Sequence, residues 1–185
     1  GIVFVFQDGM LFFSYGAMII AFIALQIGVF MSNRWSSKFQ PHVQLEAALK
    51  GLDKQYTLYN YMTGAPHLLV GPAGIFHLIT YHQSGTITYD ENKKRWKQKG
   101  GNAYMKIFGQ ESLGRPDLDI QAYTTDLNKY FAKTVPELHA EIKHEPILLF
   151  LSEKVAVDAK NAPVVTITPS KLKDFIRKRA KTKPV

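Results

Sequence analysis

An uncharged apolar run near the start of the chain constrains its fold more than any other feature. Residues 10–31, MLFFSYGAMIIAFIALQIGVFM, contain no Asp, Glu, Lys or Arg. At about 1.5 Å per residue, a helix of this length covers the roughly 30 Å hydrocarbon core of a bilayer. A signal peptide fits less well, because the run is too long and no basic segment precedes it. A buried helix of a soluble protein is the other alternative, and we expect a transmembrane helix at residues 10–31.

The residues before this run favour an additional membrane segment. Residues 1–9 read GIVFVF and then Gln-Asp-Gly, an apolar stretch that ends in residues typical of a turn. We interpret them as the end of an earlier membrane helix, which makes residues 10–31 the second helix of a hairpin. A short segment lying in the membrane interface is the alternative.

Small residues mark one side of the predicted membrane helix. They recur at spacings of three and four, at Ser14, Ala17, Ala21, Ala24 and Gly28. Such a face lets membrane helices approach closely, because lipid supplies no hydrophobic drive for their association. We expect it to contact either the chain's own earlier helix or an integral membrane subunit of a larger complex.

The charge distribution predicts the orientation and the partners. All 23 basic residues, beginning at Arg34, follow the apolar run, together with all but one of the 15 acidic residues. The positive-inside rule therefore places the rest of the chain on the cytoplasmic side. Its positive charge suits an anionic lipid leaflet, which a tethered domain reaches easily, or, less favoured, a nucleic acid. The absence of cysteine excludes thiol chemistry and disulfides.

The part after the membrane run has the pattern of an α/β domain. We expect a juxtamembrane linker and helix over residues 32–54, a folded domain over 55–180 and a basic tail over 181–185. Within the domain, turn residues separate short apolar runs of strand character. These predicted strands span residues 57–62, 67–70, 74–80, 86–89, 93–99, 146–152 and 164–168. One helix, at residues 117–135, is expected to face inward with Leu118, Ala122, Leu127 and Phe131, and another ends near Arg179. This order favours a mixed sheet flanked by helices.

Several of these segments resemble one known family. The stretch HLLVGPAGIFHLI at residues 67–79, followed by Gly85, by TITY and by Trp96, is similar to the NERD (nuclease-related) domain. The segments LKGLDKQYTLYNY and FGQESLGRPDLD resemble its membrane-linked bacterial branch in particular. The resemblance implies a restriction-endonuclease-like fold. In active members of that superfamily, an Asp at the start of one strand and a Glu-x-Lys on the next hold a divalent metal and assist the attack on the phosphate.

The residues at these motif positions have lost the required chemistry. The Asp position falls on Pro66 or else on His67, the Glu position on Ile79 and the Lys position on Tyr81. Glu46 matches an acidic position of the family, but one carboxylate does not hold a metal ion. A histidine site built from His67, His77 and His82 is an alternative, although no carboxylate converges with it. We therefore expect an inactive nuclease fold without catalytic residues, metal or cofactor.

Two basic segments are candidate contacts for an anionic partner. The first comprises Lys93, Lys94, Arg95, Trp96 and Lys97, and the second comprises Arg177, Lys178 and Arg179. A basic strand with an aromatic residue can bind nucleic acid by phosphate contact and stacking. The alternative for the first segment is a solvated hairpin whose Trp96 packs on the sheet.

Together these patterns favour a non-catalytic accessory or scaffold subunit of a bacterial membrane complex, with its domain at the cytoplasmic face of the cytoplasmic membrane. Two other functions stay open. One is a metal-dependent nuclease with a displaced active site, and the other is a nucleic-acid-binding membrane tether without chemistry.

Overall fold

The computed structural model describes residues 2–35, 40–101 and 112–182, with the side chains of the first helix described for residues 13–29. The chain divides into two compact units, Gly1–Val43 and Gln44–Val185. The division falls inside the second helix. Each unit is described separately below.

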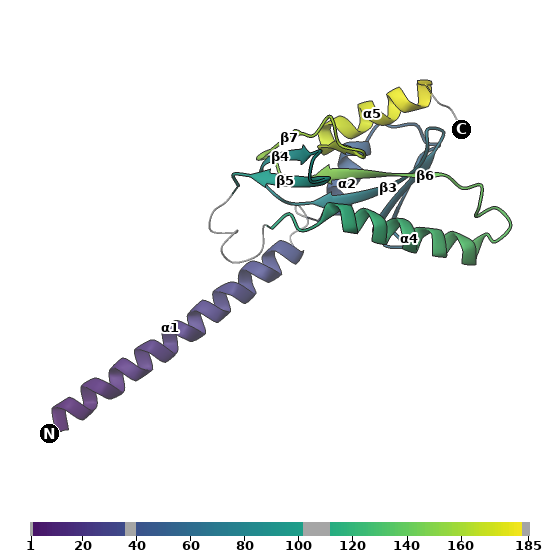
Figure 1. Cartoon of the computed structure of the whole chain (residues 1–185). Helices are drawn as coiled ribbons and strands as arrows, with labels where there is room; N and C mark the ends of the chain where they lie inside the picture. Colours follow the sequence, from purple (N-terminus) through teal and green to yellow (C-terminus); the bar gives the residue numbers. More distant parts are fainter. Residues whose placement is uncertain (1, 36–39, 102–111, 183–185) are drawn as a thin grey trace. The chain divides into compact units, whose positions relative to one another are not determined.

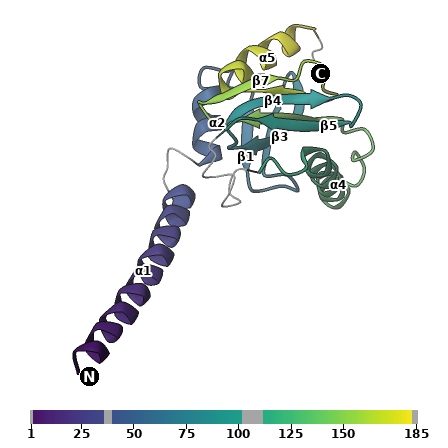
Figure 2. The same cartoon turned by 60° about the vertical axis from the view of Figure 1, so that its left-hand side comes forward.

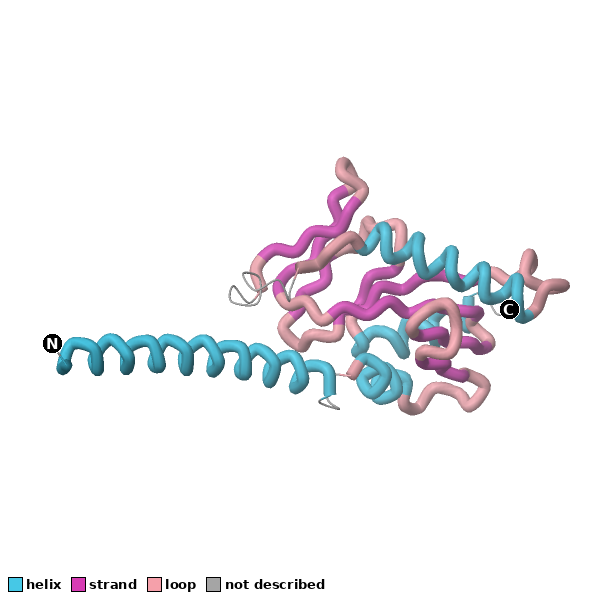
Figure 3. Tube along the Cα trace, turned by 90° about the horizontal axis from the view of Figure 1, so that it is seen from below, coloured by secondary structure: helices cyan, strands magenta, loops and turns pink. Residues whose placement is uncertain are grey.

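The first unit is dominated by one uninterrupted helix, α1, Ile2–Trp35 (Figure 3). The predicted turn at residues 7–9 is wrong, because α1 continues through Gln7, Asp8 and Gly9. A single glycine inside a helix costs only about 1 kcal/mol relative to alanine, which does not interrupt a helix with 26 further residues beyond it. The hairpin that this turn would have closed is therefore not present within α1.

Within the residues that the structure describes, no helix is both long enough and apolar enough to span a membrane. The predicted span at residues 10–31 is thus not confirmed. The side chains of residues 10–12, 30 and 31, which belong to that span, lie outside the described residues.

The second unit is an α/β domain with two mixed sheets flanked by helices. The larger sheet has the strand order β1-β2-β3-β6-β8, and the smaller one has the order β5-β4-β7. The strands of the larger sheet are β1 Thr57–Asn60, β2 His67–Gly71, β3 Gly74–Tyr81, β6 His144–Phe150 and β8 Val165–Ile167. Those of the smaller sheet are β4 Gly85–Asp90, β5 Arg95–Lys99 and β7 Val155–Asp158.

Strand directions follow from the connections. Strands β1, β2 and β3 form an antiparallel meander, while β6 is parallel to β3 and β8 is parallel to β6. The return from β3 to β6 passes through β4, β5 and the helix α4, Pro116–Thr134. A parallel pair needs such a long crossover, whereas an antiparallel pair needs only a tight turn.

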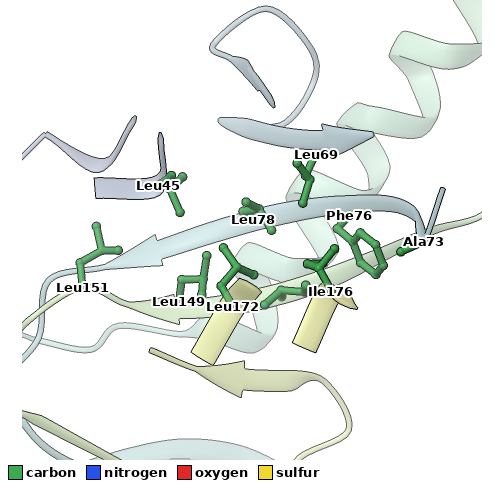
Figure 4. Close-up of a cluster of buried hydrophobic side chains, with 10 residues drawn as sticks. Leu45, Leu69, Ala73, Phe76, Leu78, Leu149, Leu151, Leu172 and Ile176 are labelled. Atoms are coloured by element: carbon green, nitrogen blue, oxygen red, sulfur yellow. The ribbon is translucent and has the colours of Figure 1, made fainter. Parts of the chain in front are cut away.

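The helices cover both faces of the larger sheet. Helices α2, Pro41–Leu49, and α5, Pro169–Thr182, lie on one face, and α4 lies on the other (Figures 1 and 2). Figure 4 shows the core under α5, where Leu172 and Ile176 meet Phe76 and Leu78 of β3 and Leu149 of β6. On the α4 face, Leu127 and Phe131 pack with Leu68 of β2. Because adjacent residues of a strand point to opposite faces, β3 supplies both cores.

Three sequence predictions differ from this fold. The segment of β7, where we predict no strand, is a strand that completes the smaller sheet, and the strands form two sheets rather than one. On α4, the predicted inward residues Leu118 and Ala122 are exposed, whereas Leu127 and Phe131 are buried. Ile120 and Tyr123 occupy the inward face of the first turns. The spacing from Ile120 to Tyr123, Leu127 and Phe131 fits the helical period, whereas the step of five from Ala122 to Leu127 does not.

Candidate functional site

The positions onto which the resemblance places the nuclease motif do not converge on one face of the sheet. Ile79 and Tyr81 are buried in the core beneath α4 and the smaller sheet, next to Leu148 and Phe150 of β6. His67 pairs with Leu78 across β2 and β3, so it faces the opposite side. Pro66, one residue earlier, precedes β2. A metal ion held at Ile79 and Tyr81 could therefore not be reached by His67.

Tyr81 stands at the position where the resemblance places a lysine, and its side chain forms a hydrogen bond between β3 and α4. Its hydroxyl group donates to Oδ2 of Asp119, in the first turn of α4, across 2.6 Å. Its ring stacks on Phe150 with 5.3 Å between the ring centroids. Burial, and then the hydrogen bond to Asp119, raise the pKa of Tyr81 above its usual value of 10.0. The phenol is thus held neutral and donates to the carboxylate, which ties the centre of the sheet to α4.

The retained acid Glu46 belongs to a separate polar group on the other face. The Nδ2 group of Asn60 donates to Oε1 of Glu46 at 3.3 Å. Nδ1 of His67 lies 2.8 Å from Oδ1 of Asn60 and donates to it, because an amide oxygen only accepts. His67 is buried, and its ring also contacts Tyr61 edge-on at 4.9 Å. The group links α2, β1 and β2, and Glu46 is its only carboxylate within the described residues.

The buried His77 begins a chain of hydrogen bonds that reaches the exposed Asn128 of α4. Nε2 of His144 lies 2.8 Å from Oδ1 of Asn128, and Nδ1 of His144 lies 3.2 Å from Nδ1 of His77. Nε2 of His77 lies 3.4 Å from the hydroxyl of Thr124. Since the Asn128 oxygen only accepts, Nε2 of His144 carries its hydrogen, and Nδ1 of His144 accepts one from His77. Nε2 of His77 then accepts from Thr124.

The chain is satisfied with both rings neutral, whereas two charged rings would point an N–H group of each ring at the other. Burial, and then the charge of His144, lower the pKa of His77 to about 4, and burial lowers the pKa of His144. His77 and His67 face opposite sides of the sheet, and His82 is exposed at the end of β3. Among residues 2–35, 40–101 and 112–182, no group of three His, Cys, Asp or Glu side chains is placed to hold a metal ion.

The aromatic residue of the basic hairpin is part of the core. Trp96 on β5 is buried, and its Nε1 donates to Oγ1 of Thr166 on β8 across 3.1 Å. It packs edge-on against Tyr89 of β4. The neighbouring Lys93, Lys94, Arg95 and Lys97 are exposed. Trp96 therefore joins the two sheets and does not present its ring to a base.

Two of the three candidate cations on α5 have partners inside the domain. Nη2 of Arg177 donates to the backbone oxygen of Gly51, just after the C-terminal end of α2, across 2.9 Å. Arg179 forms an ion pair with Glu145. Lys178 is exposed. The basic character of this helix thus serves in part to hold α2 and β6.

The predicted packing face lies within the described part of α1. Ser14, Ala17, Ala21, Ala24 and Gly28 are all exposed, as are the larger apolar side chains around them. A Cβ atom added at Gly28 would meet no atom within 4 Å.

Comparison of the chain with models of protein families, with curated proteins and with solved structures gives no match. The resemblance to the NERD domain therefore stays a prediction, and the functional argument rests on the residues and the geometry described above.

Sequence reasoning did not find the partners that define these polar groups. Asp119 lies in the first turn of α4, where acids commonly stabilise the helix dipole, and Asn128 and His144 belong to no recognisable motif. Their roles depend on the packing of α4 on β3 and β6 and on the pairing of those strands, and the hydrogen bonds join residues 16 to 67 positions apart. Thr124, a polar residue next to the inward-facing Tyr123 of α4, is the one signal that could have indicated such a network.

Proposed function

We propose that this chain is a non-catalytic, membrane-anchored protein of NERD-like, restriction-endonuclease-like fold. Its role is that of an accessory or scaffold subunit of a bacterial membrane complex, with the α/β domain at the cytoplasmic face. The proposed absence of catalysis rests on one observation, the burial of Ile79 and Tyr81 in an apolar core. These are the positions where the resemblance expects the Glu and Lys of the nuclease motif.

The contacts of Ile79 and Tyr81 do not favour a metal site at these positions. Ile79 packs with Leu148, and the Tyr81 hydroxyl donates its hydrogen bond to Asp119. Asp119 is thus committed to a neutral phenol, and Glu46 is committed to Asn60 on the opposite face. A divalent cation requires several oxygen ligands converging on one point, and these two carboxylates do not converge.

Anchoring in a membrane is supported by the composition and surface of α1. Residues 10–31 are free of charge. The described large apolar side chains of α1 are exposed on every side of the helix, with Phe13 at 84 % and Ile20 at 69 % exposed. A helix that is apolar all round needs an apolar environment, which is a protein interior or a bilayer. Arg34 and the later basic residues then favour the cytoplasmic side for the domain.

A partner subunit is supported by the small-residue face of α1. Lipid surrounds apolar side chains as well as another helix does, so close helix association relies on small residues that let the backbones approach. The face formed by Ser14, Ala17, Ala21, Ala24 and Gly28 provides five such residues on one side. An integral membrane subunit with a complementary helix is the partner that this face fits.

A cleavage assay tests the absence of catalysis. The full chain, purified in an uncharged detergent, is incubated with single- and double-stranded DNA and with RNA in Mg²⁺ or in Mn²⁺. We expect no cleavage above a preparation without the chain. Metal-dependent cleavage that is lost in Glu46→Ala and retained in Glu153→Ala, an exposed acid in a loop, would overturn the proposal in favour of a nuclease.

A further inference from the structure

A basic pocket lies between the edge strand β5 and the start of α4. Its volume is about 260 Å³, and the side chains that line it include Arg95, Trp96, Lys97, Gln98, Arg115 and Asp117. Three of these carry a positive charge and one a negative charge. The strand β5 is an edge of the smaller sheet, so the pocket opens beside backbone that no further strand covers within the described residues.

Arg115 already holds an oxyanion in this pocket. Its Nε and Nη2 donate to the two oxygens of Asp117 at 3.0 and 2.7 Å, a bidentate arrangement. A guanidinium group has five N–H donors, so three of the Arg115 donors are not used by this pair. The Arg115 side chain is 58 % exposed, which leaves these donors accessible to a ligand.

The other two cations are also able to bind an anion. Lys97 forms an ion pair with Asp90 on the neighbouring strand at 2.5 Å, and its side chain is 44 % exposed. Arg95 is exposed and takes part in neither pair. The pKa of Asp117 is held below its usual value chiefly by the hydrogen bond to Arg115, with a smaller electrostatic contribution from Arg95. The charges of Arg95 and Arg115 therefore act on the same point.

We propose that this pocket binds a phosphate group, with Arg95, Lys97 and Arg115 as its ligands and the Asp117 carboxylate as the internal group that the phosphate displaces. A carboxylate has two oxygens, which suffice for Arg115 alone, whereas a phosphate has enough oxygens to bridge two guanidinium groups and an ammonium group. The phosphate belongs either to a small soluble molecule or to a lipid headgroup. This proposal does not depend on the proposed absence of nuclease activity.

Because phosphate would displace Asp117 from Arg115, substitutions of the cations and of Asp117 should change the affinity for phosphate in opposite directions. Removing a cation weakens phosphate binding, whereas neutralising Asp117 strengthens it, because the competing negative charge is gone. The probes are inorganic phosphate and dihexanoylphosphatidic acid, with the zwitterionic dihexanoylphosphatidylcholine as the lipid control. Binding to the full chain in an uncharged detergent is measured by calorimetry at constant ionic strength.

We expect Arg95→Ala and Arg115→Ala each to weaken phosphate binding about fivefold, and Asp117→Asn to tighten it by about the same factor. The matched controls are Lys129→Ala and Asp126→Asn, which alter the 3.4 Å ion pair farther along the same helix. These controls leave the affinity unchanged. Far-UV circular dichroism verifies that each variant is folded.

The two probes assign the source of the phosphate. Tighter binding of phosphatidic acid than of inorganic phosphate, with no binding of phosphatidylcholine, assigns the pocket to a lipid headgroup, and equal binding assigns it to a soluble phosphate. The proposal is overturned if neither probe binds even to Asp117→Asn. It is equally overturned if the Lys129 and Asp126 controls change the affinity as much as the pocket variants do.

Discussion

The hydroxyl group of Tyr81 on β3 lies 2.6 Å from Oδ2 of Asp119 on α4 and donates a hydrogen bond to it. This bond joins β3 to α4, the helix in the crossover from β3 to β6, at the position where the resemblance to the NERD domain would place a lysine. Under the proposed function, a tyrosine at this position supports the fold and does not supply the chemistry of a lysine. The bond also makes the contribution of Tyr81 measurable.

Replacing Tyr81 by phenylalanine should lower the free energy of unfolding by about 1–2 kcal/mol, because a hydrogen bond to a charged acceptor is lost while the ring keeps its stacking on Phe150. The measurement is urea denaturation of the full chain in an uncharged detergent. Asp119→Asn and the double variant complete a mutant cycle. Additive effects of the two substitutions would show that the bond does not stabilise the fold.

The histidine chain predicts a loss of stability in acid. The pKa of His77 is lowered to about 4, so the unfolded chain binds a proton at about pH 6.5 while the folded chain does not. The contribution is fully present above about pH 6.5 and is lost progressively as the pH falls to about 4. By then the loss of stability amounts to about 3 kcal/mol.

His77→Leu isolates this effect. Between pH 7 and pH 4.5 the free energy of unfolding should fall less steeply in the variant than in the original chain, even though the variant is less stable at pH 7. His139→Leu, which alters an exposed histidine bonded to the backbone of Pro136, is the control. Equal pH dependence of His77→Leu and the original chain would exclude the neutral histidine chain.

Trp96 should behave as a core residue. Trp96→Phe removes the hydrogen bond to Thr166 and part of the buried ring, so we expect a loss of about 1–3 kcal/mol of stability. The exposed Lys93→Ala in the same hairpin should change stability by less than about 0.5 kcal/mol. If Trp96→Phe instead leaves stability unchanged and weakens binding to single-stranded DNA, the ring serves nucleic-acid stacking.

Introducing the acid that the resemblance expects at position 79 should destabilise the domain. Ile79→Glu places an unpaired carboxylate beside Leu148 and Phe150, which we expect to cost about 3 kcal/mol or more in thermal or urea unfolding. Ile79→Val, which keeps the site apolar, should cost about 1 kcal/mol. A stable Ile79→Glu variant that binds Mn²⁺ would mean that this position tolerates a metal-binding carboxylate.

Much of the fold could be predicted from the sequence because local signals were strong. The strands β2 to β5 are bounded by Gly, Pro and Ser residues, and the apolar residues of α5 have helical spacing, so both were expected at nearly the observed bounds. The strand β7 has only four residues at the edge of its sheet, and it gains its hydrogen bonds from β4, which lies about 70 residues earlier. No local sequence pattern predicts the pairing of β7 with β4.

The candidate site was harder to predict because its groups form across the sheet. The motif positions Ile79 and Tyr81 are two residues apart on one strand, so alternation puts them on one face, and both lie in the same core. That His67 faces the other side depends on the register between β2 and β3, and a shift of one residue would reverse it. The partners Asp119, Asn128 and His144 depend on how α4 lies across β3 and β6.

The small-residue face of α1 makes the partner proposal testable in the chain itself. Ala21→Leu enlarges a residue on this face, whereas Ile19→Phe enlarges one on the opposite side of the helix, about 160° away. If the face contacts another membrane helix, Ala21→Leu should release the chain from its complex and Ile19→Phe should not. Release by both substitutions, or by neither, would count against this face as the contact.

The most direct test of the central claim is the size at which this chain migrates after mild detergent solubilisation of native membranes. The solubilised membranes are separated by size, and the chain is located by mass spectrometry. A membrane-anchored accessory subunit is predicted to appear in the membrane fraction and to migrate with one larger assembly together with the same integral membrane proteins in repeated preparations. Migration as a single chain without a reproducible partner, or recovery outside the membrane fraction, would contradict the account.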